Sequence, residues 1–131
     1  MVKFDRVYIT NKGLTKFFSP LESEIMYALW ECDALTSQQV TEITAIPQAS
    51  TSGILDRLVR NGYVLKKSYH SVNNGAKYNY SAAFTYDVIA EDIMFRILDS
   101  LYETFGELAE KSILKYKTKP YVSGNDSNVC D

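Results

Sequence analysis

The segment STSGILDRLVR, residues 50–60, combines small hydroxyl side chains with two arginines at helical spacing. A first helical turn made of small residues lets the end of the helix approach a ligand closely, and its exposed N–H groups favour anions. Hydroxyls can bond to phosphates or to base edges, and basic side chains neutralise phosphates. We therefore expect a DNA-binding surface formed by Ala49, Ser50, Ser52, Arg57 and Arg60 of this helix, extended by the basic residues Lys66, Lys67 and Lys77 that follow it.

The charge distribution fits a polyanionic partner. The net charge is only −2, but it is divided unevenly along the chain. Residues 1–18 and 47–84 carry net charges of +3 and +4, whereas residues 19–46 and 85–111 each carry −5. Two basic segments in a mildly acidic chain favour binding to nucleic acid, although a solvated charged surface accounts for the same pattern.

A purely structural interpretation of the same residues stays open. In that case residues 50–52 only cap a helix, and Arg57 pairs with Asp56 or another acid. Serine and threonine are preferred capping residues, and arginine pairs readily with carboxylates. The residues themselves are compatible with both interpretations.

Three short helices are predicted around this segment. Ser19, Pro20 and Glu22 form a capping box at the start of the first helix, and Thr36 with Gln39 repeats the pattern for the second. The third helix begins near Pro47 and runs to Asn61, where Gly62 ends it. The periodicity directs these residues toward the core: Leu21, Ile25, Leu29 and Cys32 from the first helix, and Val40 and Ile43 from the second.

A hairpin and a longer helix follow. YVLKKSYHSV and AKYNYSAA have strand character, and Asn73-Asn74-Gly75 between them is a strong hairpin-turn signal. A helix is expected from Thr85, with Gly106 as a kink or break. Its apolar seam cannot remain in water, so the helix either folds back over the body of the protein or packs against its copy in a second subunit. In the second case the dimerisation surface is formed by Ile93, Met94, Ile97, Leu98, Leu101, Phe105 and Leu108.

Three helices followed by a hairpin is the winged helix-turn-helix plan, in which the third helix enters the major groove of DNA. The predicted fold is mainly α with a small antiparallel β wing, followed by one or more C-terminal dimerisation helices. We expect an N-terminal extension at residues 1–18, the DNA-binding domain at 19–84, dimerisation helices at 85–116, and a polar, disordered tail at 117–131.

Other classes of protein find little support in the sequence. No apolar run approaches the roughly 18–20 residues that span a membrane, so a cytoplasmic, soluble protein without membrane contact is expected. Cys32 and Cys130 are far apart and suggest neither a disulfide framework nor a metal site, and no cofactor is expected. The only histidine, His70, lies in a strand pattern without catalytic neighbours, so we do not expect an enzyme.

Four stretches carry a resemblance to a known family: GLTKFFSPLESEIMYALWE, ILDRLVRNGYV, YNYSAAFTYD and ETFGELAEKSIL. In their order and spacing the chain resembles the penicillinase-repressor (BlaI/MecI-like) family of winged-helix transcriptional regulators. The resemblance implies a homodimer, held mainly by the C-terminal helices, that binds an inverted-repeat operator in double-stranded DNA and represses transcription. It places Gln48, Ala49, Ser50 and Ser52 nearest the bases and Arg57 toward the DNA backbone.

The chain departs from the family pattern at three points. Many members have a basic residue or a second threonine where this chain has Ser52 and Gly53, so an operator sequence does not transfer. The Asn-Phe pair at which antibiotic-responsive members are cut has no match here, and Cys130 stands alone where copper-responsive members carry a cysteine cluster. An effector or sensor protein is therefore an expected partner of unknown identity.

A different class of function is the main alternative. A winged helix can serve as a protein–protein interaction module without specific DNA binding, with the apolar helix recruiting another partner. A wing used for protein contact has little need for Lys66, Lys67 and Lys77 on one hairpin, whereas phosphate binding predicts such a concentration. The charge pattern therefore favours DNA.

Overall fold

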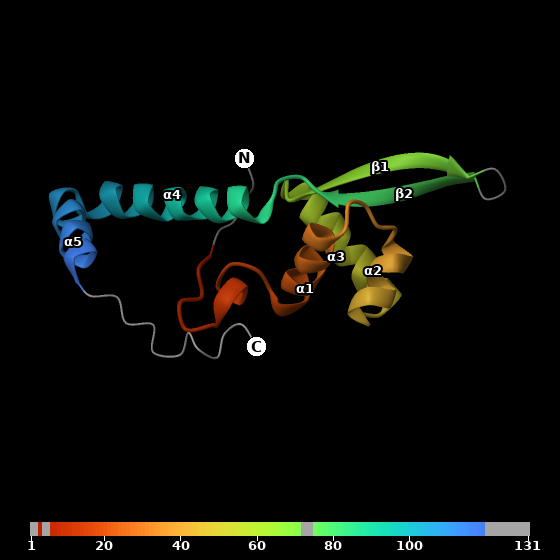
Figure 1. Ribbon diagram of the computed structural model, residues 1–131, viewed down its shortest axis with the longest axis horizontal. Helices are drawn as coiled ribbons and strands as arrows, with labels where there is room; N and C mark the ends of the chain where they lie inside the picture. The colour runs from red at the N-terminus through yellow and green to blue at the C-terminus, as the bar shows by residue number, and fades with distance from the viewer. Residues whose placement is uncertain (1–2, 4–5, 72–74, 120–131) are drawn as a thin grey trace. The chain divides into compact units, whose positions relative to one another are not determined.

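The computed structural model of the protein describes residues 3, 6–71 and 75–119. Backbone contacts divide the chain into two compact units, residues 1–89 and residues 90–131. The first unit contains a short 3-10 helix, η1 (Gly13–Lys16), three α-helices and a two-stranded sheet (Figure 1). No helix among the described residues is long and apolar enough to cross a membrane.

The helices α1 (Pro20–Glu31) and α2 (Ser37–Thr44) begin with the capping boxes that the sequence predicts. Ser19 accepts a hydrogen bond from the Glu22 N–H at 3.1 Å, and the Glu22 carboxylate accepts one from the Ser19 N–H at 2.9 Å. Thr36 and Gln39 form the same reciprocal pair, at 3.1 and 2.8 Å. Both helix starts are thus satisfied by their own side chains.

The predicted inward faces are correct for most positions and wrong for two. Ile25, Leu29 and Val40 are buried, but Leu21 and Ile43 are 41% and 54% exposed. Leu21 lies in the first turn of α1, where buried Ser23 faces inward instead. In α2 the least exposed residues follow the helical repeat Ser37, Val40, Thr41 and Thr44, a face that leaves out Ile43.

Helix α3 (Gln48–Arg60) ends as the sequence predicts, with Asn61 at the C-cap and Gly62 beyond it at a φ of 89°. The Gly62 N–H donates to the Val59 carbonyl at 3.1 Å, and the Tyr63 N–H donates to the Leu58 carbonyl at 3.0 Å. These two bonds form a Schellman motif, which needs the left-handed backbone that glycine adopts without strain. Leu58 and Tyr63 are both buried, so the turn also leads the chain from the helix into the wing through the core.

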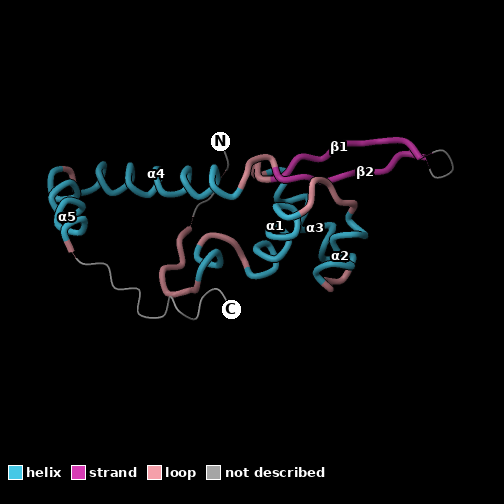
Figure 2. Tube along the Cα trace, viewed as in Figure 1, coloured by secondary structure: helices cyan, strands magenta, loops and turns pink. Residues whose placement is uncertain are grey.

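The wing consists of β1 (Val64–Ser71) and β2 (Gly75–Ala82), paired antiparallel with Val64 opposite Ala82 (Figure 2). Of the predicted turn, residues 73 and 74 lie outside the described residues, and β2 begins at Gly75. Leu35, which lies between α1 and α2, forms two backbone hydrogen bonds with Tyr80, at 2.7 and 2.9 Å. The wing is therefore anchored to the helices by backbone pairing and by the buried ring of Tyr80.

An aromatic cluster closes the first unit where the chain leaves the wing. The Trp30 indole N–H donates to the Phe84 carbonyl at 3.0 Å, and its ring meets those of Tyr27 and Tyr86 edge-on, with centroids 5.8 and 5.1 Å apart. Burial raises the pKa of the Tyr27 phenol above its ordinary value, and the nearby Tyr86 phenolate adds to that rise. These contacts fix the start of the next helix against α1.

That next helix, α4 (Tyr86–Phe105), begins at the predicted cap, where Thr85 Oγ1 accepts a hydrogen bond from the Val88 N–H at 3.3 Å. The chain then breaks at Gly106, which has a φ of 57°, and α5 (Glu107–Thr118) follows. The break at Gly106 confirms one of the two predicted outcomes, and Figure 1 shows α5 turning away from the line of α4. Residues 120–131, including Cys130 and most of the predicted polar tail, lie outside the described residues.

Candidate nucleic-acid interface

The first turn of α3 has no side-chain cap, in contrast to α1 and α2. Pro47 occupies the N-cap position, and the first backbone bond of the helix runs from the Thr51 N–H to the Pro47 carbonyl at 2.9 Å. The N–H groups of residues 48–50 therefore have no partner inside the helix. Because these residues are exposed, the turn presents N–H groups and the positive end of the helix dipole to solvent. The hydroxyls of residues 50–52 lie within the helix and do not cap it.

One hydroxyl of this turn faces inward. Thr51 is fully buried, and its Oγ1 accepts a hydrogen bond from Thr41 Oγ1 at 2.9 Å and donates one to the Ile46 carbonyl at 3.3 Å. Buried hydroxyls need such partners, and this chain of bonds ties α3 to α2. The Thr51 side chain thus positions the exposed turn and is not available to a ligand.

Gln48 connects the same turn to the start of α2. Its side-chain amide donates to Ser37 Oγ at 3.1 Å and to Ser52 Oγ at 3.3 Å. All of these bonds are exposed, so the three polar side chains form one surface where the N-terminal ends of two helices meet. Ser37 was not among the residues predicted from the sequence.

The surface continues from α2 to the wing. A hollow of about 260 Å³ is lined by residues from the start of α2 and from β2, namely Thr36, Ser37, Gln38, Lys77, Tyr78 and Tyr80. Lys77 is a predicted DNA-binding residue, whereas the residues of α2 were missed. The Thr36 capping box was a usable signal, because it marks a helix N-terminus only 11 residues before the start of α3 (from position 37 to position 48).

The register of the wing places its lysines on two faces. Lys66 lies opposite Tyr80, and its Nζ is 4.3 Å from the centroid of the Tyr78 ring, a cation–π contact. Lys67 pairs with Asn79 and Lys77 pairs with Tyr69, which puts both lysines on the other face. All three lysines are exposed.

The predicted residues of α3 are not all on one side of the helix. Ala49, Ser52, Asp56 and Arg60 recur at steps of three and four and are all exposed, so they form an outward stripe. Arg60 lies about 18 Å along the helix from the uncapped end, at 1.5 Å per residue. Asp56, an acid within this stripe, was not singled out in the sequence as part of the surface.

Arg57 lies beside the outward stripe, on the side of α3 that meets α1. Its Nε donates to Glu22 at 2.8 Å, and the Glu22 carboxylate side chain is only 15% exposed. The pairing with another acid, which the structural interpretation predicted, is therefore present, although the partner is Glu22 and not Asp56. The Arg57 side chain itself remains 46% exposed.

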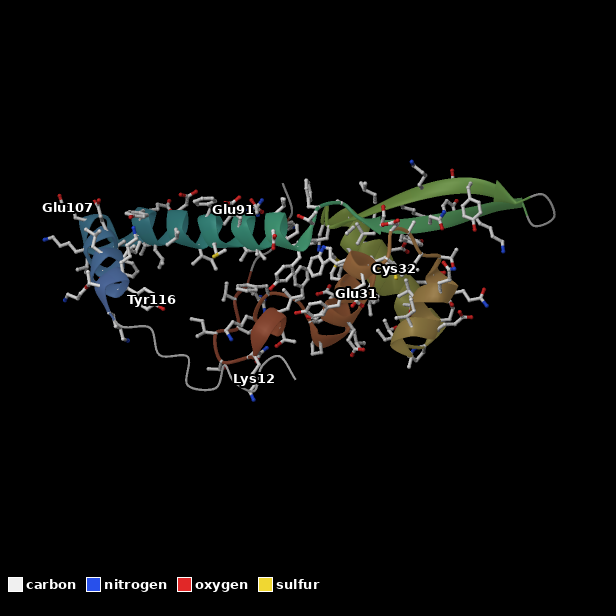
Figure 3. The ribbon with its side chains drawn as sticks, viewed as in Figure 1. Lys12, Glu31, Cys32, Glu91, Glu107 and Tyr116 are labelled. Atoms are coloured by element: carbon white, nitrogen blue, oxygen red, sulfur yellow. The ribbon has the colours of Figure 1, made fainter. Side chains whose placement is uncertain are left out.

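The predicted dimerisation residues differ in exposure. Ile93 is buried within the chain, Ile97 and Leu98 are half-buried, and Met94, Leu101, Phe105 and Leu108 are exposed. Within the second unit an apolar groove of about 480 Å³ is lined by Leu98, Leu101, Phe105, Leu108, Ala109, Ser112, Ile113 and Tyr116. The last four residues belong to α5 and were missed, because the break at Gly106 changes which side chains adjoin. Figure 3 shows Tyr116 toward the end of α5.

Comparisons with solved structures bear on the fold. A possible transcriptional regulator from Methanosarcina mazei Go1 is 10% identical and has a TM-score of 0.57, and the match covers 72% of this chain and 78% of that one. The Bordetella bronchiseptica protein BpsR, whose DNA binding is regulated by 6-hydroxynicotinic acid, is 18% identical with a TM-score of 0.50, covering 86% and 87%. At these identities the likeness concerns the fold, which is that of winged-helix transcriptional regulators.

A search of curated proteins found no sequence that matches this chain. The family model described as penicillinase repressor matches residues 18–120, which covers α1 to α5 and the wing. That match extends over most of the chain. It includes three of the four stretches on which the sequence resemblance rests and most of the remaining one, whose residues 13–17 precede the match. The chain therefore belongs to the penicillinase repressor family, and it is a DNA-binding transcriptional regulator of the winged-helix type.

Proposed function

We propose that the protein is a homodimeric repressor that binds an inverted-repeat operator through the first turn of α3, the start of α2 and the wing. The observation that carries this proposal is the uncapped first turn of α3, whose N–H groups point to solvent beside exposed hydroxyls. Helices α1 and α2 satisfy this end with a side chain, whereas the first turn of α3 leaves its N–H groups to water or to a ligand. Helix α5 also starts without a side-chain cap, but its first turn carries the acids Glu107 and Glu110, whereas the first turn of α3 carries no acid. A phosphate or a base edge supplies the missing acceptor when DNA is bound.

Two roles are assigned to the surrounding residues. Gln48, Ser50 and Ser52, with Ala49 between them, are proposed to read base edges in the major groove. Arg60, Lys66, Lys67 and Lys77, together with the start of α2, are proposed to hold phosphates and to fix the position of α3 in the groove. Arg57 is assigned to the DNA backbone as well, with Glu22 holding its Nε in place.

Dimerisation is proposed to use the groove formed by α4 and α5. Its exposed leucines and Phe105 form an apolar surface that a soluble chain rarely leaves uncovered. A symmetric pair of subunits would present two copies of α3 to half-sites about 34–36 Å apart on one face of the duplex.

The salt dependence of DNA affinity tests the proposal. Duplexes selected from random DNA by the purified protein should show palindromic half-sites, and affinity for them should fall steeply with salt. Lys67→Ala should make the slope of log K against log salt shallower by about 0.9, the value for one phosphate contact. Lys115→Ala removes an exposed lysine from α5 and should leave the slope unchanged. A flat salt dependence in the unmodified protein would instead support the protein–protein interaction module.

A further inference from the structure

A second hollow of the first unit lies away from the uncapped end of α3. It has a volume of about 470 Å³, within the range of small-molecule sites, and is lined by residues of the N-terminal arm (residues 3 and 6–12), of the start of α1 and of the end of α3. Two backbone bonds hold the arm over it. The Lys3 N–H donates to the Asn61 carbonyl at 2.9 Å, and the Tyr8 N–H donates to the Lys16 carbonyl at 2.8 Å. The arm is thus fastened to the end of α3 and to η1.

The floor of this pocket is aromatic and well packed. Phe18 and Tyr63 are 4% and 3% exposed, and their rings meet edge-on with centroids 4.8 Å apart. Phe17 and Tyr8 add further aromatic surface to the lining. A flat apolar ring would find edge and face contacts here without disturbing the core, because the floor residues are already fixed.

The rim of the pocket is cationic. Among the described lining residues Lys3, Arg6 and Arg57 face a single acid, Glu22. That carboxylate already accepts hydrogen bonds from the Ser19 N–H and from Arg57 Nε. In the part of the chain that the structure describes, neither Lys3 nor Arg6 forms an ion pair. Among the described lining residues the rim thus carries three basic side chains and one acid, beside an aromatic floor.

We propose that this pocket binds a small aromatic carboxylate, with the ring on Phe18 and Tyr63 and the carboxylate held by Lys3 and Arg6. An inorganic anion would use the rim but not the floor, and a neutral aromatic molecule would use the floor but leave the cations without a counter-charge. The guanidinium of Arg6 suits a planar carboxylate because it can donate two parallel hydrogen bonds.

Occupancy of the pocket has a consequence for DNA binding, and this step rests on the proposed function. Arg57 lines the pocket and belongs to α3, so a carboxylate bound beside it lowers the positive potential that a phosphate would meet. The two anions then oppose each other, and by linkage each weakens the binding of the other by the same factor.

Titration of the full chain by amide NMR, without DNA, tests the site directly. The probe is 2-naphthoate, compared with neutral 2-naphthalenemethanol and with inorganic phosphate. Shift changes are expected at Asn61 and Tyr63 and not at Ala109 in the α4–α5 groove, and both comparison compounds should bind at least tenfold more weakly. Arg6→Ala should raise the dissociation constant of 2-naphthoate by roughly tenfold, the effect of one charge-assisted hydrogen bond. Lys12→Ala, in the same arm but outside the pocket lining, should change it less than twofold.

Several results would overturn the proposal. If 2-naphthalenemethanol binds as tightly as 2-naphthoate, the basic residues of the rim do not contribute to recognition. If phosphate binds as tightly as 2-naphthoate, the aromatic residues of the floor do not contribute. Shift changes confined to the α4–α5 groove move the site elsewhere. In a separate measurement, 2-naphthoate should weaken DNA binding several-fold in the unmodified protein and in Lys12→Ala, whereas Arg6→Ala should need roughly tenfold more of the compound for the same effect. An unchanged DNA affinity refutes the antagonism, whereas a chain that binds no DNA at all refutes the proposed function and leaves the NMR result standing.

Discussion

Replacing Gly53 with alanine should make the protein more stable and a weaker DNA binder. Gly53 lies within α3 on its exposed side, and a Cβ built there would meet no atom within 4 Å. Glycine inside a helix costs about 0.5–1 kcal/mol relative to alanine, because the unfolded chain has more freedom to lose. Since the added methyl group neither gains nor loses contacts, Gly53→Ala should gain that amount of folding free energy.

The affinity of the protein for DNA, in contrast to its stability, is expected to fall in Gly53→Ala. Packing within the protein does not require a glycine at position 53, because a Cβ there would meet no other atom. A close approach of α3 to a base or a phosphate would require a residue without a side chain. A methyl group forced into a close contact typically costs about 1–3 kcal/mol, which is roughly a 5- to 150-fold loss of affinity. The loss should be largest for the selected operator, because only there is α3 fully seated in the groove.

Urea unfolding at fixed protein concentration provides the stability measurement. With a slope of about 2 kcal/mol per molar urea, the midpoint of Gly53→Ala should rise by about 0.3–0.5 M. Gly13→Ala is the matched control, because Gly13 also has open space around a built Cβ but has a φ of 56°. The same substitution there should destabilise by about 1–2 kcal/mol. A Gly53→Ala protein that is more stable and binds the operator with undiminished affinity would refute the argument that α3 needs a small residue at this point.

Three further predictions concern other parts of the molecule. Thr51→Val should lower the free energy of unfolding by about 1–3 kcal/mol, because the Ile46 carbonyl loses its hydrogen-bond donor. Ser50→Ala, the control, should change it by no more than about 0.5 kcal/mol. Equal effects of the two substitutions in urea unfolding would contradict the inward role of Thr51. Leu101→Asp, in the α4–α5 groove, should give a monomer in sedimentation experiments. Leu114→Asp changes a leucine that is exposed but lies outside the groove, and this variant should remain a dimer. A monomeric unmodified protein would overturn this expectation. The Tyr27 phenol should ionise above pH 10 in an absorbance titration, because burial and Tyr86 raise its pKa. Well below pH 10 the phenol is neutral in both states. As the pH approaches and passes 10, the Tyr27 phenol ionises first in the unfolded chain, so the free energy of unfolding falls with rising pH, and it should fall less in Tyr27→Phe.

The elements of the fold follow closely from local signals in the sequence. The capping boxes at Ser19 and Thr36, and the left-handed Gly62, each involve residues within a few positions of one another, so their outcome does not depend on the rest of the chain. The break at Gly106 was one of two outcomes, because a helical glycine costs too little to end a helix by itself. Its positive φ shows that this chain does end the helix there.

The candidate site depends on contacts that local patterns do not contain. Arg57 and Glu22 are 35 positions apart, and nothing in the spacing of either residue identifies the other as its partner. The start of α2 was missed for a similar reason, since its place beside Lys77 depends on how the wing folds back over the helices. Of the α5 residues in the groove, Leu108 was predicted from the seam, whereas Ala109, Ser112, Ile113 and Tyr116 were missed, since the break before α5 changes which side chains adjoin.

The small residues at the start of α3 have different roles because successive helical residues point about 100° apart. Thr51 is turned inward, where its hydroxyl bonds to Thr41 and Ile46 and fixes the helix on α2. Ser50 and Ser52, on either side of it, are turned outward, and Gly53 leaves open space beside Ser52. A bulky residue at any of these positions would either disrupt the packing or cover the uncapped N–H groups. The composition of this turn is thus explained by two requirements on α3: its buried face must be fixed to α2, and its exposed face must carry only small side chains so that a partner can approach closely.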